Sequence, residues 1–138
     1  MVEFVFVAVV VMLPLLYLIV AVATVEASNL AVTQAAREAG RAFATSESPA
    51  QAGARVDAAV HLALSDQGIA DEPEVRFVAA GAACDGAAVV PRLAPGAEFA
   101  ICVSRHVELP ALPRFLQGRG ITTVGRYVVH VDEYRAFG

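Results

Sequence analysis

Two cysteines, three histidines and a few paired acids are the side chains of this chain that could carry out chemistry. Ser104 and His106 are two positions apart and would share one face of a strand, but no third group is spaced to orient the histidine as a nucleophilic triad requires. His61, His106 and His130 occur singly, without the spacing of zinc ligands. Because HExxH, Gly-rich phosphate-loop and nucleophile-elbow motifs are also missing, we expect no enzyme, no cofactor and no metal.

The charged residues give no sign of a nucleic-acid or lipid-headgroup partner. All ten basic residues are arginines, they form no cluster, and the net charge is −4. A protein that binds phosphate backbones needs a basic patch, so we predict no nucleic-acid partner. The acid pairs Asp71-Glu72 and Asp132-Glu133 lie beside a predicted turn and near the chain end, and we interpret both as solvated.

The two cysteines, Cys84 and Cys102, both follow a long apolar N-terminal run. Such a pair in a small domain attached to a membrane segment is typical of a disulfide in an oxidising compartment. Two buried reduced thiols are the alternative. A bridge would tie the Ala/Gly/Pro-rich loop over 81–96 to a predicted strand and would stabilise the fold by about 3 kcal/mol.

Glu3 stands at the start of that apolar run. The twenty-two residues from Phe4 to Val25 carry no charge, and a helix needs about 20 such residues to cross a bilayer. A carboxylate at bilayer depth costs several kcal/mol unless it is paired. Glu3 therefore either lies in the headgroup zone, where the helix dipole favours it, or pairs with a neighbouring subunit. Pro14 removes one helical hydrogen bond and should bend the run; it is either simply tolerated or a local weak point.

The charges around this run and the predicted disulfide favour opposite orientations in the membrane. Arg37 and Arg41 follow the run and no basic residue precedes it, which by the positive-inside rule would place the C-terminal part in the cytoplasm. A disulfide would place that part outside. A short basic leader upstream of Met1 would remove the conflict, and we expect one. We therefore predict a single-pass protein of the bacterial cytoplasmic membrane with its C-terminal domain outside.

The helix is expected to continue beyond the membrane, from about residue 3 to 45. Polar residues recur every fourth position over 29–41, and the opposite side carries small ones. Small residues let helices approach closely, so we expect this ridge to pack against partner helices. The ridge consists of Ala27, Ala31, Ala35, Ala39 and Gly40. Residues 1–26 thus form the membrane-spanning half of the helix, and residues 27–138 form an extracytoplasmic α+β domain that includes its second half.

The rest of the chain predicts one more helix and a small sheet. Ser48, Pro49 and Gln51 form a capping-box start for a helix over 49–67 that ends at Gly68. Strands are predicted over Glu74–Ala80, Glu98–Glu108 and Ile121–Val131, and the Pro-containing stretch ELPALPRFLQGRG would connect the last two. With barely ninety residues, this part needs the long helix packed across a three- or four-stranded antiparallel sheet to form a sufficient core.

This order of elements resembles the type IV pilin-like subunits, and in detail the TadE-like proteins of the tight-adherence (Flp) pilus system. The resemblance depends on MVEFVFVAVVVMLPLLYLIV and NLAVTQAAREAGRAFATS, with a looser likeness in ITTVGRYVVHVDEYR. It implies a leader cut by a prepilin peptidase on the cytoplasmic side. It also implies that Glu3, with Phe4 after it, pairs with the N-terminal amine of a neighbouring subunit.

Two functions follow as hypotheses. The first is a minor pilin or pseudopilin that interacts with other pilin subunits and with the pilus assembly platform in the membrane. The second is a membrane-anchored accessory protein whose sheet domain binds a partner and never leaves the membrane.

Overall fold

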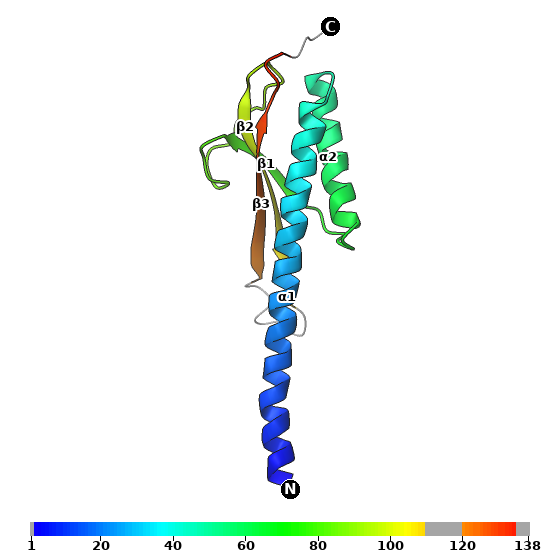
Figure 1. Cartoon of the computed structure of the whole chain (residues 1–138), viewed down its shortest axis with the longest axis vertical. Coiled ribbons are helices and arrows are strands. Elements are labelled where there is room, and N and C mark those ends of the chain that lie inside the picture. The colour runs from blue at the N-terminus through cyan, green and yellow to red at the C-terminus, as the bar shows by residue number, and fades with distance from the viewer. Residues whose placement is uncertain (1, 110–119, 135–138) are drawn as a thin grey trace.

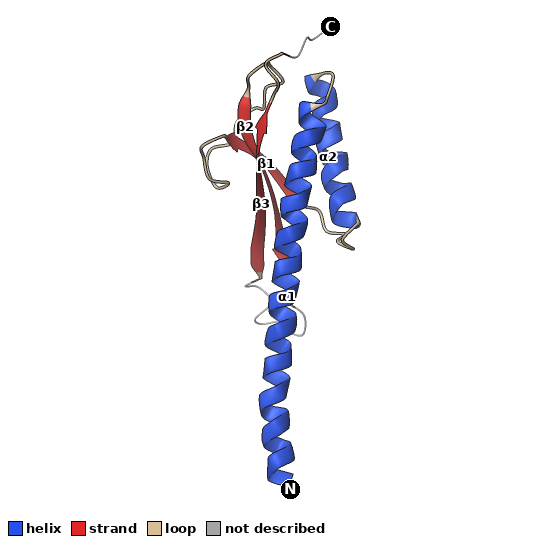
Figure 2. Cartoon of the chain, in the orientation of Figure 1, coloured by secondary structure: helices blue, strands red, loops and turns tan. Residues whose placement is uncertain are grey.

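The computed structural model describes residues 2–109 and 120–134 of the chain. The element order is α1 (Val2–Ala44), α2 (Pro49–Ser65), β1 (Glu74–Ala79), β2 (Glu98–Val107) and β3 (Ile121–His130). Figures 1 and 2 show a long straight helix whose second half lies against α2 on one side and a small sheet on the other. The predicted α+β fold is therefore confirmed, with three strands in the sheet that the structure describes.

Helix α1 runs without a break for 43 residues, through Pro14 and on past the end of the apolar run. At 1.5 Å per residue it is about 65 Å long. We call residues 3–25 the stem, and the remaining described residues, 26–109 and 120–134, the head. The N-terminal part of the stem extends below the sheet and α2 (Figure 1), so one helix belongs to both parts of the molecule.

Helix α2 begins as its sequence predicts. The hydroxyl of Ser48 accepts a hydrogen bond from the backbone N–H of Gln51, and Pro49 occupies the first turn. The Gln51 side chain accepts in return from the N–H of Glu47, one residue before the position that a capping box uses. The helix ends at Ser65, two residues earlier than predicted, where Gly68 with φ +72° turns the chain away.

The sheet is antiparallel with the order β1-β2-β3, so β2 is central. Each strand begins where it was predicted and ends one residue earlier. Residues 110–119, which form most of the connecting stretch ELPALPRFLQGRG, lie outside the described residues. Strands β2 and β3 pair over ten consecutive residues, from Glu98 with His130 to Val107 with Ile121.

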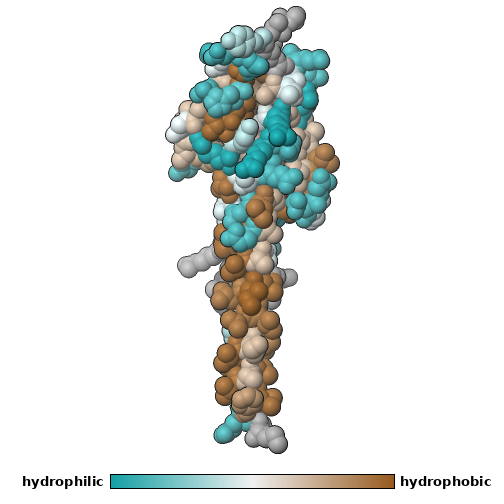
Figure 3. Space-filling view, viewed as in Figure 1, coloured by the Kyte–Doolittle hydropathy of each residue, from teal (hydrophilic) through white to brown (hydrophobic). Residues whose placement is uncertain are grey.

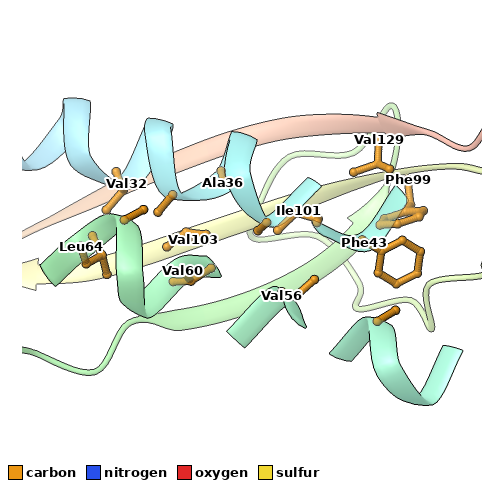
Figure 4. Packing of buried hydrophobic residues seen from close by; sticks show 14 of the residues in the cluster. Val32, Ala36, Phe43, Val56, Val60, Leu64, Phe99, Ile101, Val103 and Val129 are labelled. Carbon is orange, nitrogen blue, oxygen red and sulfur yellow. The ribbon is translucent and has the colours of Figure 1, made fainter. Parts of the chain in front are cut away.

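One face of the sheet packs against the helices and forms the main core (Figure 4). Phe43 at the end of α1 contacts Phe99 of β2 edge-to-face, with ring centroids 4.8 Å apart, and both rings lie near Phe77 of β1. Toward the stem the core consists of aliphatic side chains from both helices and β2: Val32, Ala36, Val56, Val60, Leu64, Ile101 and Val103. The predicted arrangement of a long helix across a small sheet is thus confirmed.

The opposite face of the sheet is partly covered by the loop after β1. Val78, Ala100 and Cys102 form a second, smaller cluster there with Ala82, Cys84 and Val128. The loop is attached to β1 through a backbone hydrogen bond from Val89 to Phe77 and a bridge between Val78 and Ala88. The disulfide between Cys84 and Cys102 holds this loop against the sheet.

Candidate assembly stem and its junction with the head

The stem presents apolar side chains on every side. Phe4 is 80% exposed and Leu13 61% exposed, and within the described part of the chain no residue of the most apolar eighteen-residue stretch is classed as buried. Figure 3 shows the visible face of the stem as mostly hydrophobic, below a head whose visible face is mainly hydrophilic. α1 is long and apolar enough to cross a membrane. Such a surface is unfavourable in water and requires lipid or other helices around it.

Glu3 lies in the first turn of α1 and is exposed. Within residues 2–109 and 120–134, no hydrogen bond or ion pair joins its side chain to another residue. The helix N-terminus favours a negative charge at this position through its dipole. Both roles predicted for Glu3 stay predictions, because a partner from a second subunit would come from outside the chain.

Pro14 lies in the middle of the stem, and the helix continues through it. Its ring removes the N–H that would have bonded to the carbonyl of Val10. The bend predicted at this point is not evident in Figure 1, where the stem continues the line of the upper helix.

The small-residue ridge packs inside the chain itself. Ala31, Ala35 and Ala39 are at most 1% exposed, and they belong to the core that α1 makes with α2 and the sheet. The prediction that the ridge packs against partner helices is therefore wrong for these residues and for buried Gly40. The physical reason is that small side chains bring a neighbouring backbone close, and the nearest one belongs to the same chain. Ala27, one turn lower, is exposed.

Two glycines permit this close packing of helix on sheet. A Cβ added to Gly125 of β3 would overlap the carbonyl of Val32 in α1. A Cβ added to Gly40 of α1 would overlap the ring of Tyr127, which lies on β3. The helix and β3 are therefore in backbone contact at one level and separated by a single ring at another.

A polar cluster lies at the end of the head nearest the stem. Arg105 of β2 forms an ion pair with Asp71, which follows α2, and donates to the hydroxyl of Ser28 in α1 at 3.0 Å. The Ser28 hydroxyl also shares a 2.7 Å hydrogen bond with Thr123 of β3. Both hydroxyl residues are 2% exposed and the Arg105 side chain is 13% exposed. Four segments are thus held together where α1 enters the head.

Sequence reasoning missed this junction. Asp71 is exposed, as expected, but the ion pair was not foreseen: its carboxylate also accepts two hydrogen bonds from the Arg105 guanidinium. One signal was available. Arg105 is on the same strand face as Ile101 and Val103, which are core residues, and a charge on an apolar face needs a partner.

Cys84 and Cys102 form a disulfide, as predicted. Cys102 is 2% exposed on the outer face of β2, and the bridge holds the loop after β1 against that face. On the same side, Arg126 of β3 donates to the carbonyl of Ala80. The loop is therefore attached both to the central strand and to the far strand.

The other candidate residues are not brought together. His130 pairs with Glu98 at 3.0 Å on an exposed part of the sheet. His106 is exposed and Ser104 is half-buried on the outer face. Within the described ranges there is no group of three or more His, Cys, Asp or Glu side chains that could hold a metal ion.

Comparisons of the chain with protein-family models, with curated proteins and with solved structures gave no match.

Proposed function

We propose that this chain is a minor pilin or pseudopilin subunit of a tight-adherence, type IV-like pilus that assembles through its stem. The observation that carries the proposal is the stem itself. Among the residues that the structure describes, most of this apolar helix packs against nothing else, the Glu3 side chain makes no hydrogen bond or ion pair, and the helix continues unbroken into the head.

The physical argument concerns what a pure anchor needs. A single-pass anchor requires only about 20 apolar residues, and a charge at its start adds nothing to anchoring. A charge that is paired in a bundle of apolar helices fixes the axial register of those helices, as single buried polar groups do in coiled coils. The resemblance to TadE-like proteins gives Glu3 this role, with the N-terminal amine of a neighbouring subunit as its partner. The prepilin peptidase and the assembly platform enter the proposal through the same resemblance.

One observation favours the second candidate, an anchored accessory protein of the bacterial cytoplasmic membrane with its head outside. The small-residue ridge that could have packed against other subunits is used inside the head. The stem is then the main apolar surface that the described residues leave for contacts between subunits, and a stem can also simply reside in lipid.

Substitution of Glu3 separates the two candidates. We expect Glu3→Ala to leave the protein in the membrane fraction of its native host but to remove it from sheared filaments. Glu26→Ala is the matched control, because Glu26 is an exposed acid at the other end of the stem. The measurement is immunoblotting of membrane and filament fractions. Filament incorporation of Glu3→Ala at the wild-type level would contradict the pilin proposal and favour the accessory protein.

A further inference from the structure

The lower end of the sheet lies beside the last turns of the stem. Thr123 of β3 contacts Ser28, and two residues further along the strand Gly125 contacts Val32, four helical residues higher. Two residues of β3 thus correspond to four residues of α1. This correspondence is expected when a strand runs parallel to a helix, because two strand residues rise about 6.6 Å and four helix residues rise about 6 Å.

The same correspondence places the start of β3 closer to the N-terminus of α1 than Ser28 and its polar partners. Ile121, two residues before Thr123, falls at the level of Thr24, and Val107 pairs with Ile121 in the sheet. The cavities at this end agree with that level. One of about 340 Å³ is lined by Ile121 and Leu109 together with Leu18, Ala21, Val22 and Val25 of the stem. Thr24 shares a second cavity with Val107.

These levels overlap with the membrane-spanning run. Phe4 to Val25 is about 33 Å long as a helix, and the hydrocarbon core of a bilayer is about 30 Å thick. Nearly the whole run is therefore needed to cross the core, so Val22 and Val25 lie near its outer boundary. Side chains that share a cavity with them lie at that boundary too.

We propose that the lower end of the sheet is a membrane-contact surface that rests on the lipid interface around the stem. Its members are Leu109 and Ile121, and Ile121 is 41% exposed. The exposed acids Glu26 and Glu108 lie at the same level and fit the headgroup zone. Their charges limit how deeply the sheet end can enter the bilayer, to the boundary between headgroups and acyl chains. The inference depends on the stem crossing a bilayer, which both candidate functions share, and not on pilus assembly.

Contact with lipid would orient the head relative to the membrane. A helix alone leaves a domain free to tilt about its exit point, whereas a second contact beside the helix restricts that tilt. The hydrogen bonds of Ser28, directly above this surface, connect α1 to β2 and β3 next to the stem.

The chain contains no tryptophan, so a single introduced tryptophan reports its own depth. We would reconstitute full-length single-tryptophan variants in phosphatidylcholine vesicles carrying spin-labelled lipids that quench at shallow or deep positions. Ile121→Trp reports the proposed surface, and Thr122→Trp repeats the measurement at the next exposed position should Ile121→Trp fail to fold. Val124→Trp is the matched control, since Val124 is 45% exposed on the same strand and about 10 Å farther from the membrane. Val90→Trp in the head and Leu13→Trp in the stem are the two reference points.

We expect the shallow label to quench Ile121→Trp roughly twofold or more strongly than Val124→Trp, because the interface is only about 5–10 Å deep. Val90→Trp should be unaffected, and the deep label should quench Leu13→Trp. If Leu13→Trp is quenched while Ile121→Trp and Thr122→Trp behave like Val90→Trp, the contact surface is overturned and the anchor stands. If Leu13→Trp is not quenched, the anchor and the contact surface fall together. Neither result depends on incorporation of the protein into filaments.

Discussion

The two halves of α1 are one uninterrupted helix in two different surroundings. In the stem, large side chains such as Phe4, Leu13 and Leu16 are more than half exposed. In the head, Val32, Ala35 and Ala36 are fully buried against α2 and the sheet. The backbone geometry is the same throughout, so the difference comes from side-chain size and from the number of faces that are apolar.

This difference shows where each half finds its partner. The upper half packs inside the head, and β3 comes into backbone contact with it where Gly125, which has no side chain, lies against Val32 and Thr33. Large apolar side chains all round keep other backbones away and present a uniform surface, which suits lipid or a loosely packed bundle. The upper half is therefore packed against the rest of the head, whereas most of the lower half is exposed among the residues that the structure describes.

The largest expected effect comes from filling the backbone contact in the head. Gly125→Val should lower the free energy of unfolding of the head by about 3 kcal/mol or more, because the added side chain meets the backbone of Val32, which cannot move aside. The matched control is Gly53→Ala in α2, where a Cβ meets nothing within 4 Å. It should raise stability by about 0.5–1 kcal/mol through helix propensity. Urea denaturation of the full chain in detergent micelles, followed by circular dichroism, measures both. Equal stabilities for the two variants would contradict the backbone contact.

The next largest effect comes from making the same Leu→Ala substitution in the buried head and in the exposed stem. Leu64→Ala in α2 removes a side chain that is 1% exposed, and it should destabilise the head by about 3 kcal/mol. Leu16→Ala in the stem removes one that is 54% exposed, and it should change the stability of the head by less than about 0.5 kcal/mol. The same denaturation experiment compares them. A similar loss for Leu16→Ala would mean that the stem packs against the head more closely than its exposure indicates.

The sequence predicted the elements well because their signals are local. The uncharged run, the Ser48 cap and the β-branched strands each depend on neighbours along the chain, and the bounds agree within two residues. The disulfide was also predicted, because two cysteines in such a domain leave a single pairing. The residues that pack against the small-residue ridge could not be predicted from local sequence signals. An alanine ridge indicates that a backbone comes close but not whose backbone it is.

The polar junction illustrates the same limit. Arg105 and Asp71 are thirty-four positions apart, and Ser28 is seventy-seven positions from Arg105. Their contact depends on the register of β2 against β3 and on the level at which α1 crosses the sheet. Neither quantity is encoded in a short window of sequence. A buried arginine could be suspected from the apolar strand face, but its partner could not be identified.

The smallest effect concerns this junction and sharpens the boundary between the two halves of α1. Asp71→Asn preserves the shape of the side chain and removes its charge, so the mostly buried Arg105 loses its ionic partner. Because Asp71 itself is half exposed, solvent screens the loss, and we expect a destabilisation of about 1 kcal/mol. Asp57→Asn, at an exposed acid of α2, should change stability by less than about 0.5 kcal/mol.

Hydrogen exchange locates the effect of Asp71→Asn along the helix. Ser28 is held by Arg105 and Thr123, so a loosened junction should accelerate exchange of the amides around residues 26–30. Amides at Ala35 and Ala36 are held by core packing that the substitution does not touch, and their exchange should change only by the global loss of stability. Uniform acceleration along the upper half of α1 would mean that the junction is not a separate unit. Local acceleration would show that polar contacts, and not the alanine ridge, define where the stem ends and the head begins.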